Sequence, residues 1–487
     1  MKATVMKMST LLLALLTVAG LAACADNADT KTDVTTDIGT ETQAPQETEE
    51  VRIPGPEKTD LNGFELRVAS WAPFTDYIII EEANGDVVDD TLYNADLAVM
   101  EEYNCVITNA LSADFPVVTD TIHTAVLAGD NAYGLSYNHD CQTVANVLKN
   151  CFLDIRSCDV FNFDAPWWTD TVNTFTVNDR LYFASNFLTY SPMYQAMILC
   201  YNKDLANTYD IEIPYDDIFA GNWYMEDLIA MVQNTNADVN GDSDIVLGED
   251  QFGFISNSLG MACIQVCLGG TILVPDEEGY LSLDVDLNRL QTMSETFSRL
   301  MEFGVDTLPD GRWDYGTSYF SHGQSLFNYS QISMISSTLR DADFRYGTLP
   351  FPKLDEQQKN YITSVLDAYW AIPTTVADDV DAIATILEAK AQRCFYEVLP
   401  VSFETALQTK FSDAPEDAKT YEIIRDTMIV DAGYAYNEQD GGIANLIRIL
   451  SNTDSGTLSS FIEKNIKSAE KAVEKINETY QKMGDLG

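Results

Sequence analysis

Segments with strand periodicity and segments with helix periodicity alternate along this chain, and that alternation is the feature that most limits its fold. Every second side chain is apolar in residues 64–68, which predicts a strand over 63–70. Residues 90–103 carry apolar side chains at helical spacing, and a short strand is predicted at 106–107. Alternating units of this kind favour an α/β fold with helices on both faces of each sheet.

The same alternation continues toward the C-terminus. We expect helices at 119–128, 225–232 and 379–392, and strands at 181–183, 197–201, 332–335 and 369–372. Residues 457–483 place their apolar side chains on one face, which predicts a long amphipathic helix. The chain has 487 residues, enough for two large lobes.

Charge and apolar content together exclude two classes of protein. The chain has 76 acidic and 28 basic residues, a formal net charge of -48 that would repel phosphate backbones, so we expect no nucleic-acid partner. Because 46% of the residues are hydrophobic, the charge does not indicate global disorder. The acidic residues therefore cover a folded body.

The first residues have the pattern of an export signal. Lys2 and Lys7 precede an apolar run at 11–21, which is too short to span a bilayer. The following Leu21-Ala22-Ala23-Cys24 resembles the bacterial lipobox, so we expect residues 1–23 to be removed and Cys24 to be lipidated. A plain signal peptide with an incidental Cys24 is the alternative. Residues 24–59, rich in Thr, Asp, Glu and Pro, are predicted to form an acidic disordered tether.

Four sequence features occur in a characteristic order. They are the lipobox with its acidic tether, Pro166-Trp167-Trp168 followed by the segments 180–184 and 199–205, Gly221-Asn222-Trp223 at a helix start, and Gly347-Thr348-Leu349-Pro350-Phe351-Pro352-Lys353 before a returning strand. Together they resemble the extracellular solute-binding proteins of bacterial ABC importers, the family that contains the maltose-binding-like proteins. The resemblance covers roughly residues 63–400.

That resemblance implies an α/β, two-lobed periplasmic-binding-protein-like fold of type II, with hinge-crossing strands and C-terminal helices. The expected lobes are 60–195 plus 325–375 and 196–324 plus 376–487. The implied protein is a monomer on the extracytoplasmic face of the cell membrane, held by its lipid anchor alone. It would capture a small solute and deliver it to ABC permease subunits without acting as an enzyme. The family resemblance favours an oligosaccharide as that solute. The residues alone do not exclude a peptide or a polyamine as the solute.

A binding cleft needs aromatic faces and a few polar groups. Trp71 follows the first predicted strand, where α/β sheets bind ligands, and Trp370 lies beside Asp367 at the expected return crossing. For each tryptophan the alternative is a place in the core. The complete set of ligand-binding candidates is Trp71, Asp76, Trp168, Tyr190, Trp313, Asp367 and Trp370.

Residues 238–249 have the spacing of a calcium-binding loop. Oxygen-bearing side chains fall at positions one, three, five, seven and twelve, which are Asp238, Asn240, Asp242, Asp244 and Glu249. Position six, normally glycine, is Ser243, which counts against the match. The hypothesis is a structural Ca²⁺, and the alternative is an acidic surface turn.

Cysteines and histidines give no sign of catalysis. Apart from Cys24 there are eight cysteines, an even number that permits disulfides, with Cys151 and Cys158 as the favoured local pair; buried thiols are the alternative. The sequence has no zinc-ligand spacing, no histidine motif of a hydrolase and no phosphate-binding loop. We also expect no organic cofactor. The alternatives from other classes are an exported glycoside hydrolase that uses an Asp/Glu pair, and a surface lipoprotein without a transport role.

Overall fold

The computed structural model describes residues 52–72, 78–112, 114–307, 316–339, 342–402, 415–438 and 442–484. All of them belong to the compact unit Arg52–Gly487. The predictions for the signal peptide, for Cys24 and for the ligand candidates Asp76 and Trp313 lie outside the described residues.

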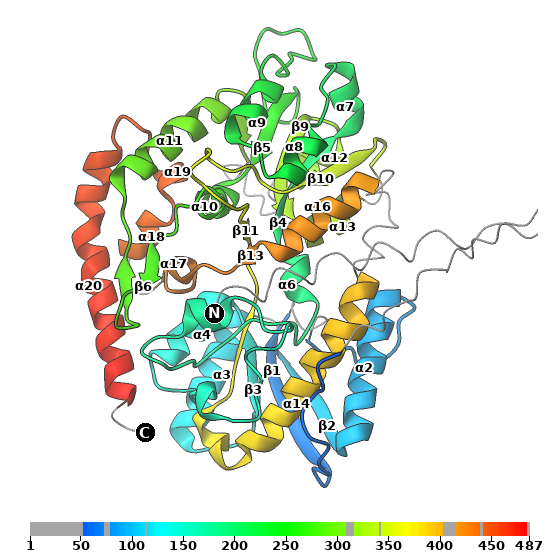
Figure 1. Cartoon of the computed structure of the whole chain (residues 1–487), viewed down its shortest axis with the longest axis vertical. Coiled ribbons are helices and arrows are strands. Elements are labelled where there is room, and N and C mark those ends of the chain that lie inside the picture. The colour runs from blue at the N-terminus through cyan, green and yellow to red at the C-terminus, as the bar shows by residue number, and fades with distance from the viewer. Residues whose placement is uncertain are drawn as a thin grey trace, which may run out of the picture. The chain divides into compact units, whose positions relative to one another are not determined.

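The first lobe is built on a four-stranded sheet of order β12-β3-β1-β2 (Figure 1). Its strands are β1 (Phe64–Trp71), β2 (Cys105–Ser112), β3 (Leu135–Asn138) and β12 (Tyr369–Ala371). Strands β1, β2 and β3 pair in parallel, whereas β12 pairs antiparallel to β3. The helices of this lobe include α2 (Val87–Tyr103), α3 (Phe115–Ala128), α4 (Asp140–Val147) and α14 (Val380–Arg393). The strands predicted at 63–70, 106–107 and 369–372 and the helices predicted at 90–103, 119–128 and 379–392 are confirmed, with bounds shifted by a few residues.

Local sequence signals explain where the first helix begins and ends. The Asp86 side chain accepts hydrogen bonds from the backbone N–H groups of Val88 and Asp89, which is the N-cap geometry that opens α2. Asn104 then adopts a left-handed conformation, with φ of 50°, and ends the helix. The buried side chains of α2, such as Leu92 and Val99, recur at helical spacing.

The second lobe contains a five-stranded mixed sheet of order β10-β4-β9-β5-β8. Its strands are β4 (Met197–Asn202), β5 (Phe252–Ser256), β8 (Gly304–Asp306), β9 (Ser325–Gln331) and β10 (Tyr346–Leu349). Every residue of β4, β5, β9 and β10 is buried, which explains their continuous apolar or small-residue runs. Helices α9 (Met225–Val232), α10 (Ser258–Cys267) and α11 (Leu287–Met301) belong to this lobe.

Two predictions of secondary structure are wrong. Residues 332–335 belong to a helix, α13 (Ile332–Thr338), and the strand β9 lies directly before it. The Ile332 N–H still donates to Ala196 O, in register with the β4–β9 ladder, but the chain turns into a helix from Ile332 onward, and the apolar pair Ile332 and Ile335, three residues apart, fits a helix face. Residues 181–183 form no named strand; the residues on either side make isolated bridges, Arg180 to Val177 and Ala184 to Trp370.

The lobe predicted for two segments is also wrong. Strands β9 and β10 pair with β4 in the second sheet, although residues 325–375 were assigned to the first lobe from sequence. Helix α14 packs against α2 in the first lobe, although residues 376–487 were assigned to the second. Strand pairing across long sequence separations decides lobe membership, and periodicity within a segment does not report it.

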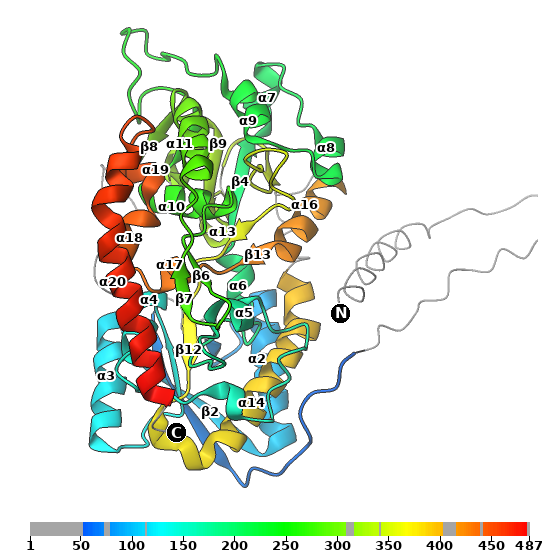
Figure 2. The same cartoon turned by 60° about the vertical axis from the view of Figure 1, so that its left-hand side comes forward.

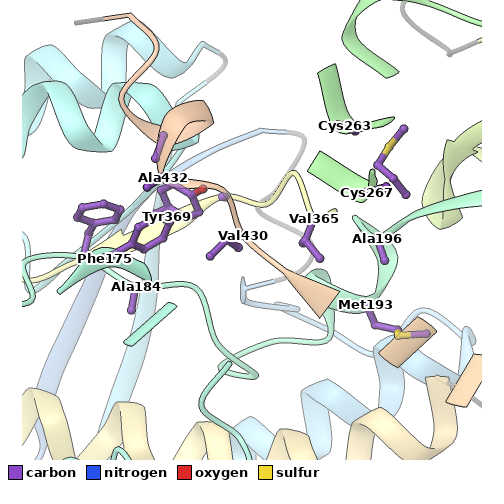
Figure 3. Packing of buried hydrophobic residues seen from close by; sticks show 14 of the residues in the cluster. Phe175, Ala184, Met193, Ala196, Cys263, Cys267, Val365, Tyr369, Val430 and Ala432 are labelled. Atoms are coloured by element: carbon purple, nitrogen blue, oxygen red, sulfur yellow. The ribbon is translucent and has the colours of Figure 1, made fainter. Parts of the chain in front are cut away.

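Three segments run between the lobes. Residues 195–196 lead from α6 (Ser191–Tyr194) into β4, and residues 364–368 lead from β11 (Thr363–Ser364) to β12. The third links β13 (Met428–Ile429) to α17 (Ala432–Ala435), which contacts α4. The segments bond to one another, since Leu366 N donates to Gln195 O and Val365 N to Ile429 O. Figure 3 shows the buried side chains there, with Val365 near Ala196 and Val430, and Tyr369 beside Phe175.

The C-terminal helix α20 (Leu458–Gly484) confirms the predicted amphipathic helix. Its apolar face packs on α18 (Gly442–Leu446), on β7 (Leu281–Leu283) and on α11 (Figure 2). No helix in the described part of the chain combines the length and apolarity needed to cross a bilayer.

The described body begins inside the segment that was predicted as tether. The Ile53 N–H donates to Tyr396 Oη at 3.1 Å, and Gln392 Nε2 donates to Ile53 O at 2.9 Å. The Arg52 guanidinium lies 5.2 Å from the Tyr396 ring centroid. Residues 52 and 53 are therefore held against the C-terminal end of α14.

Candidate functional site

A cleft of about 440 Å³ lies where the two lobes meet. Its lining comes from both lobes and from the crossing segments, and includes Trp71, His139, Asp140, Gln195, Leu259, Gln331, Ser333, Met334, Asp367 and Tyr434. This composition is aromatic and aliphatic with a few polar groups, and the described lining contains no Lys or Arg.

Trp71 and His139 reach the cleft because β1 and β3 are parallel neighbours. Each residue lies at or just after the carboxyl end of its strand, the edge where open α/β sheets bind ligands. The Trp71 ring meets the Phe115 ring edge-on, with centroids 5.2 Å apart, and lies 5.5 Å from the His139 ring. These contacts fix the indole while leaving it partly exposed.

Asp367 lines the cleft from the second crossing segment. Its side chain is buried and accepts hydrogen bonds from Ser185 Oγ, at 2.7 Å, and from Ser191 Oγ. Burial raises the pKa of Asp367 to about 6, and the two serine hydrogen bonds offset part of that effect. The predicted ligand candidates Trp71 and Asp367 thus share one cleft.

The other aromatic candidates lie in the core. Trp168 Nε1 donates to Glu388 Oε2 at 3.2 Å, and Trp370 Nε1 donates to Asn186 Oδ1 at 3.0 Å. Tyr190 Oη donates to Asp89 Oδ1 at 2.8 Å. These three candidates, Trp168, Tyr190 and Trp370, are at most 8% exposed, and none is among the described residues that line the cleft.

A different groove, of about 650 Å³, lies between α20 and the hairpin of β6 (Leu273–Pro275) and β7. Its lining is strongly acidic and comes from Asp276, Glu278, Glu470, Glu474 and Glu478 among others. No interlobe crossing contributes to it. We therefore place the candidate site in the interlobe cleft.

No protein-family model matches the sequence, and no curated protein matches it. Solved structures do match the fold. The ABC substrate-binding protein of Listeria monocytogenes in complex with cycloalternan aligns with a TM-score of 0.51 at 13% identity, over 88% of this chain and 100% of that one. A family 1 extracellular solute-binding protein from Bifidobacterium longum subsp. infantis aligns with a TM-score of 0.50 at 14% identity, over 86% and 99%.

This chain has the fold of the family 1 extracellular solute-binding proteins. The predicted two-lobed α/β architecture is thereby confirmed. M. tuberculosis UspC shows the same fold, with a TM-score of 0.52 at 15% identity over 84% of this chain and 100% of that one.

Sequence reasoning missed several residues of the cleft in this solute-binding-protein fold. His139 and Asp140 directly follow β3, a strand that was not predicted, and a four-residue strand at 135–138 would have pointed to them. Gln195 and Gln331 come together across the lobe junction, with Gln331 Nε2 donating to Gln195 Oε1 at 2.7 Å. No local sequence pattern predicts that Gln195 and Gln331 meet.

The charge of His139 is governed by Asp140. Burial lowers the pKa of His139, but the Asp140 carboxylate, with its oxygen 2.6 Å from His139 Nδ1, outweighs burial and holds that pKa above its ordinary value. Burial also raises the pKa of the neighbouring Cys141 thiol, and the adjacent carboxylates raise it further.

The loop at residues 238–249 is closed by its own hydrogen bonds. Both oxygens of Asp238 accept from backbone N–H groups, those of Gly241 and Ser243. Asn240 Nδ2 donates to Asp242 Oδ2 at 3.1 Å and to Glu249 Oε2 at 2.9 Å. Ser243 adopts a φ of 79°, the backbone region that a glycine would occupy at position six. The calcium assignment of this loop stays a prediction.

The cysteines in the structure are buried free thiols. They are Cys105, Cys141, Cys151, Cys158, Cys200, Cys263, Cys267 and Cys394. The favoured disulfide between Cys151 and Cys158 is not formed; Cys158 Sγ instead faces Asp381 Oδ1 at 3.8 Å. The alternative of buried thiols is the one that the structure shows.

Proposed function

We propose that this chain captures an oligosaccharide in its interlobe cleft and delivers it to an ABC permease. The observation that carries the proposal is the cleft itself, lined from both lobes and from the crossing segments. A two-lobed protein with such a cleft can close over a solute and remove it from water, which is how recognition without chemistry gains affinity. The cycloalternan complex of the Listeria protein supports a carbohydrate as ligand.

The chemistry of the lining also favours an uncharged, hydroxyl-rich solute. A partly exposed Trp71 face suits the C–H face of a sugar ring, and the amides of Gln195 and Gln331 can exchange hydrogen bonds with hydroxyl groups. The described lining contains no Lys or Arg, and its His139 is already paired with Asp140, so an anionic solute would meet no uncompensated positive side chain there.

Binding without catalysis is part of the proposal. Asp140 and Asp367 are the carboxylates of the described lining, and both are already engaged by protein donors. Asp140 Oδ1 accepts from the Cys141 N–H and faces His139 Nδ1, while Asp367 accepts from two serines. A glycosidase instead needs one carboxyl group that is free to donate and another that attacks or activates water.

We further propose that the protein is exported and held at the outer face of the membrane by lipid on Cys24. The lipobox and the apolar run before it support this. The acidic segment that follows would keep the lobes in solution, away from an anionic surface.

Incubation of the full chain, solubilised in detergent, with a pool of oligosaccharides tests the proposal. The retained sugars are released by denaturation and weighed by mass spectrometry. We expect unchanged members of the pool, and no retention by Trp71→Ala. Products smaller than the input would show hydrolysis and contradict the proposal, and so would a complete lack of retention from pools of peptides and sugars alike.

A further inference from the structure

Three consecutive side chains at the start of α4 bring a nitrogen, an oxygen and a sulfur donor together. One ligand atom from each of His139, Asp140 and Cys141 lies within 4.8 Å of the other two. His139 Nδ1 is 2.6 Å from Asp140 Oδ1 and 3.3 Å from Cys141 Sγ. The sequence shows no familiar zinc spacing here, because the residues are adjacent and the backbone turn at the helix start brings their side chains together.

The fold holds this cluster in place. His139 is the extended residue before α4, with ψ of 141°, and Asp140 and Cys141 form the first turn. The imidazole packs against the Phe115 ring, 4.8 Å between centroids, and against Trp71. Its Nδ1 is thereby directed at the other two donors, so the arrangement is preorganised by packing.

An acidic side chain from a distant part of the chain lies beside α4. Gln142 Nε2 donates to Glu438 Oε2 at 2.9 Å and fixes that carboxylate beside the helix. The negative charge of Glu438, added to that of Asp140, favours a cation at the three donors.

We propose that His139, Asp140 and Cys141 bind a divalent transition metal ion of the zinc type. Zinc takes nitrogen, sulfur and carboxylate oxygen at about 2.0–2.3 Å in a tetrahedron, which places neighbouring donors about 3.5 Å apart. The separation of His139 Nδ1 and Cys141 Sγ is already close to that value. Binding forms the metal–sulfur bond and releases the thiol proton to solvent.

The donor set also selects the metal. Imidazole and thiolate prefer zinc, cobalt or nickel to calcium and magnesium, which want oxygen ligands. Asp140 and Cys141 are at most 4% exposed, whereas the His139 side chain is 31% exposed and faces the cleft, which gives an ion its entry path. The metal site is separate from the acidic loop at residues 238–249 and does not depend on the identity of the solute.

Cobalt titration of the full chain tests the site directly. We expect one equivalent of Co²⁺ to produce a sulfur-to-cobalt charge-transfer band in the near ultraviolet, the visible bands of a tetrahedral site and quenching of Trp71 fluorescence. Added Zn²⁺ should displace the cobalt. Cys141→Ser should abolish the charge-transfer band and weaken Zn²⁺ binding by more than about 100-fold, since loss of an outer partner alone costs about 10- to 100-fold.

Matched variants make the result decisive. Cys105→Ser changes a buried thiol outside the cluster and should keep the band, as should Asp242→Ala in the acidic loop. His139→Gln should keep the melting temperature but lose the cobalt complex, which covers the case in which Cys141→Ser fails to fold. The proposal is overturned by a wild-type chain without a charge-transfer band, by a band that survives Cys141→Ser, or by a folded His139→Gln that binds cobalt as the wild type does. Solute retention is measured separately, so failure of the metal site leaves the proposed function intact.

Discussion

Gln331 Nε2 donates a hydrogen bond to Gln195 Oε1 at 2.7 Å, and both side chains line the interlobe cleft. Gln195 caps the end of α6 in the first lobe, and Gln331 is the last residue of β9 in the second. The bond therefore ties the two lobes together beside the first crossing segment. A solute in the cleft would meet this amide pair directly.

Breaking that amide pair should cost stability. Gln331→Leu leaves the buried Gln195 oxygen without its donor, so we expect the free energy of unfolding to fall by about 1–3 kcal/mol in urea denaturation. The double variant Gln195→Leu/Gln331→Leu removes both polar groups and should lose less than the sum of the two single changes. Strictly additive losses would show that the bond does not couple the two residues.

Trp71 should contribute to solute affinity more than to stability. We expect Trp71→Ala to weaken oligosaccharide binding at least about tenfold, or 1.4 kcal/mol, in calorimetric titration. Trp370→Phe is the matched change in the core. It removes the hydrogen bond to Asn186 and should lower the melting temperature while the affinity of the folded protein stays the same. The reverse pattern would place ligand recognition at Trp370.

Asp367 should make stability depend on pH. Its pKa is about 6 in the folded protein, against about 3.9 for an unfolded aspartate, so the fold favours the protonated form. That stabilisation is complete below about pH 4 and is lost as the pH rises through about 6, at a cost on the order of 3 kcal/mol. Asp367→Asn is neutral throughout. Its stability relative to wild type should therefore rise by about that amount between pH 4 and 7, as measured by urea denaturation; a constant difference would refute the pKa shift.

Removing one partner of the ion pair between Lys390 and Asp96 should strongly lower the free energy of unfolding. Both side chains are about 95% buried, and the pair joins α14 to α2. Lys390→Met leaves an uncompensated buried carboxylate, so we expect a loss of about 3–5 kcal/mol in the free energy of unfolding. The double variant Lys390→Met/Asp96→Leu should recover most of it. A double variant as unstable as the single one would contradict this explanation.

The calcium hypothesis for residues 238–249 predicts stabilisation by the ion. Calcium at about 100 times its dissociation constant should add about 2.7 kcal/mol and raise the melting temperature above that in chelator. In Asp242→Ala the two conditions should give the same melting temperature. Asp159→Ala, an exposed acidic residue elsewhere, should respond as wild type does. If the wild type is indifferent to chelator, the loop is an acidic turn.

Local periodicity was sufficient to predict several of the longer helices and several strands. The helices α2 and α20 and the strands β1 and β4 follow from which side chains must be buried, because that pattern is carried by neighbouring residues. It failed at residues 332–335, where the short apolar run fitted a buried strand, whereas Ile332 and Ile335 lie buried, three residues apart, on helix α13. Lobe membership failed for a related reason, since β9 and β10 pair with β4, which lies more than a hundred residues earlier in the chain.

The sequence by itself determined the α/β class, the two-lobed architecture and two residues of the interlobe cleft. Trp71 and Asp367 could be predicted because each lies next to a predicted strand end or crossing. Only the tertiary structure decided that Trp168 and Trp370 are core residues, since an indole looks the same in a sequence whether it faces a cleft or donates to a buried side-chain oxygen. It alone brought Glu438 to Gln142, and Gln331 to Gln195, because those contacts depend on how the chain crosses between its lobes.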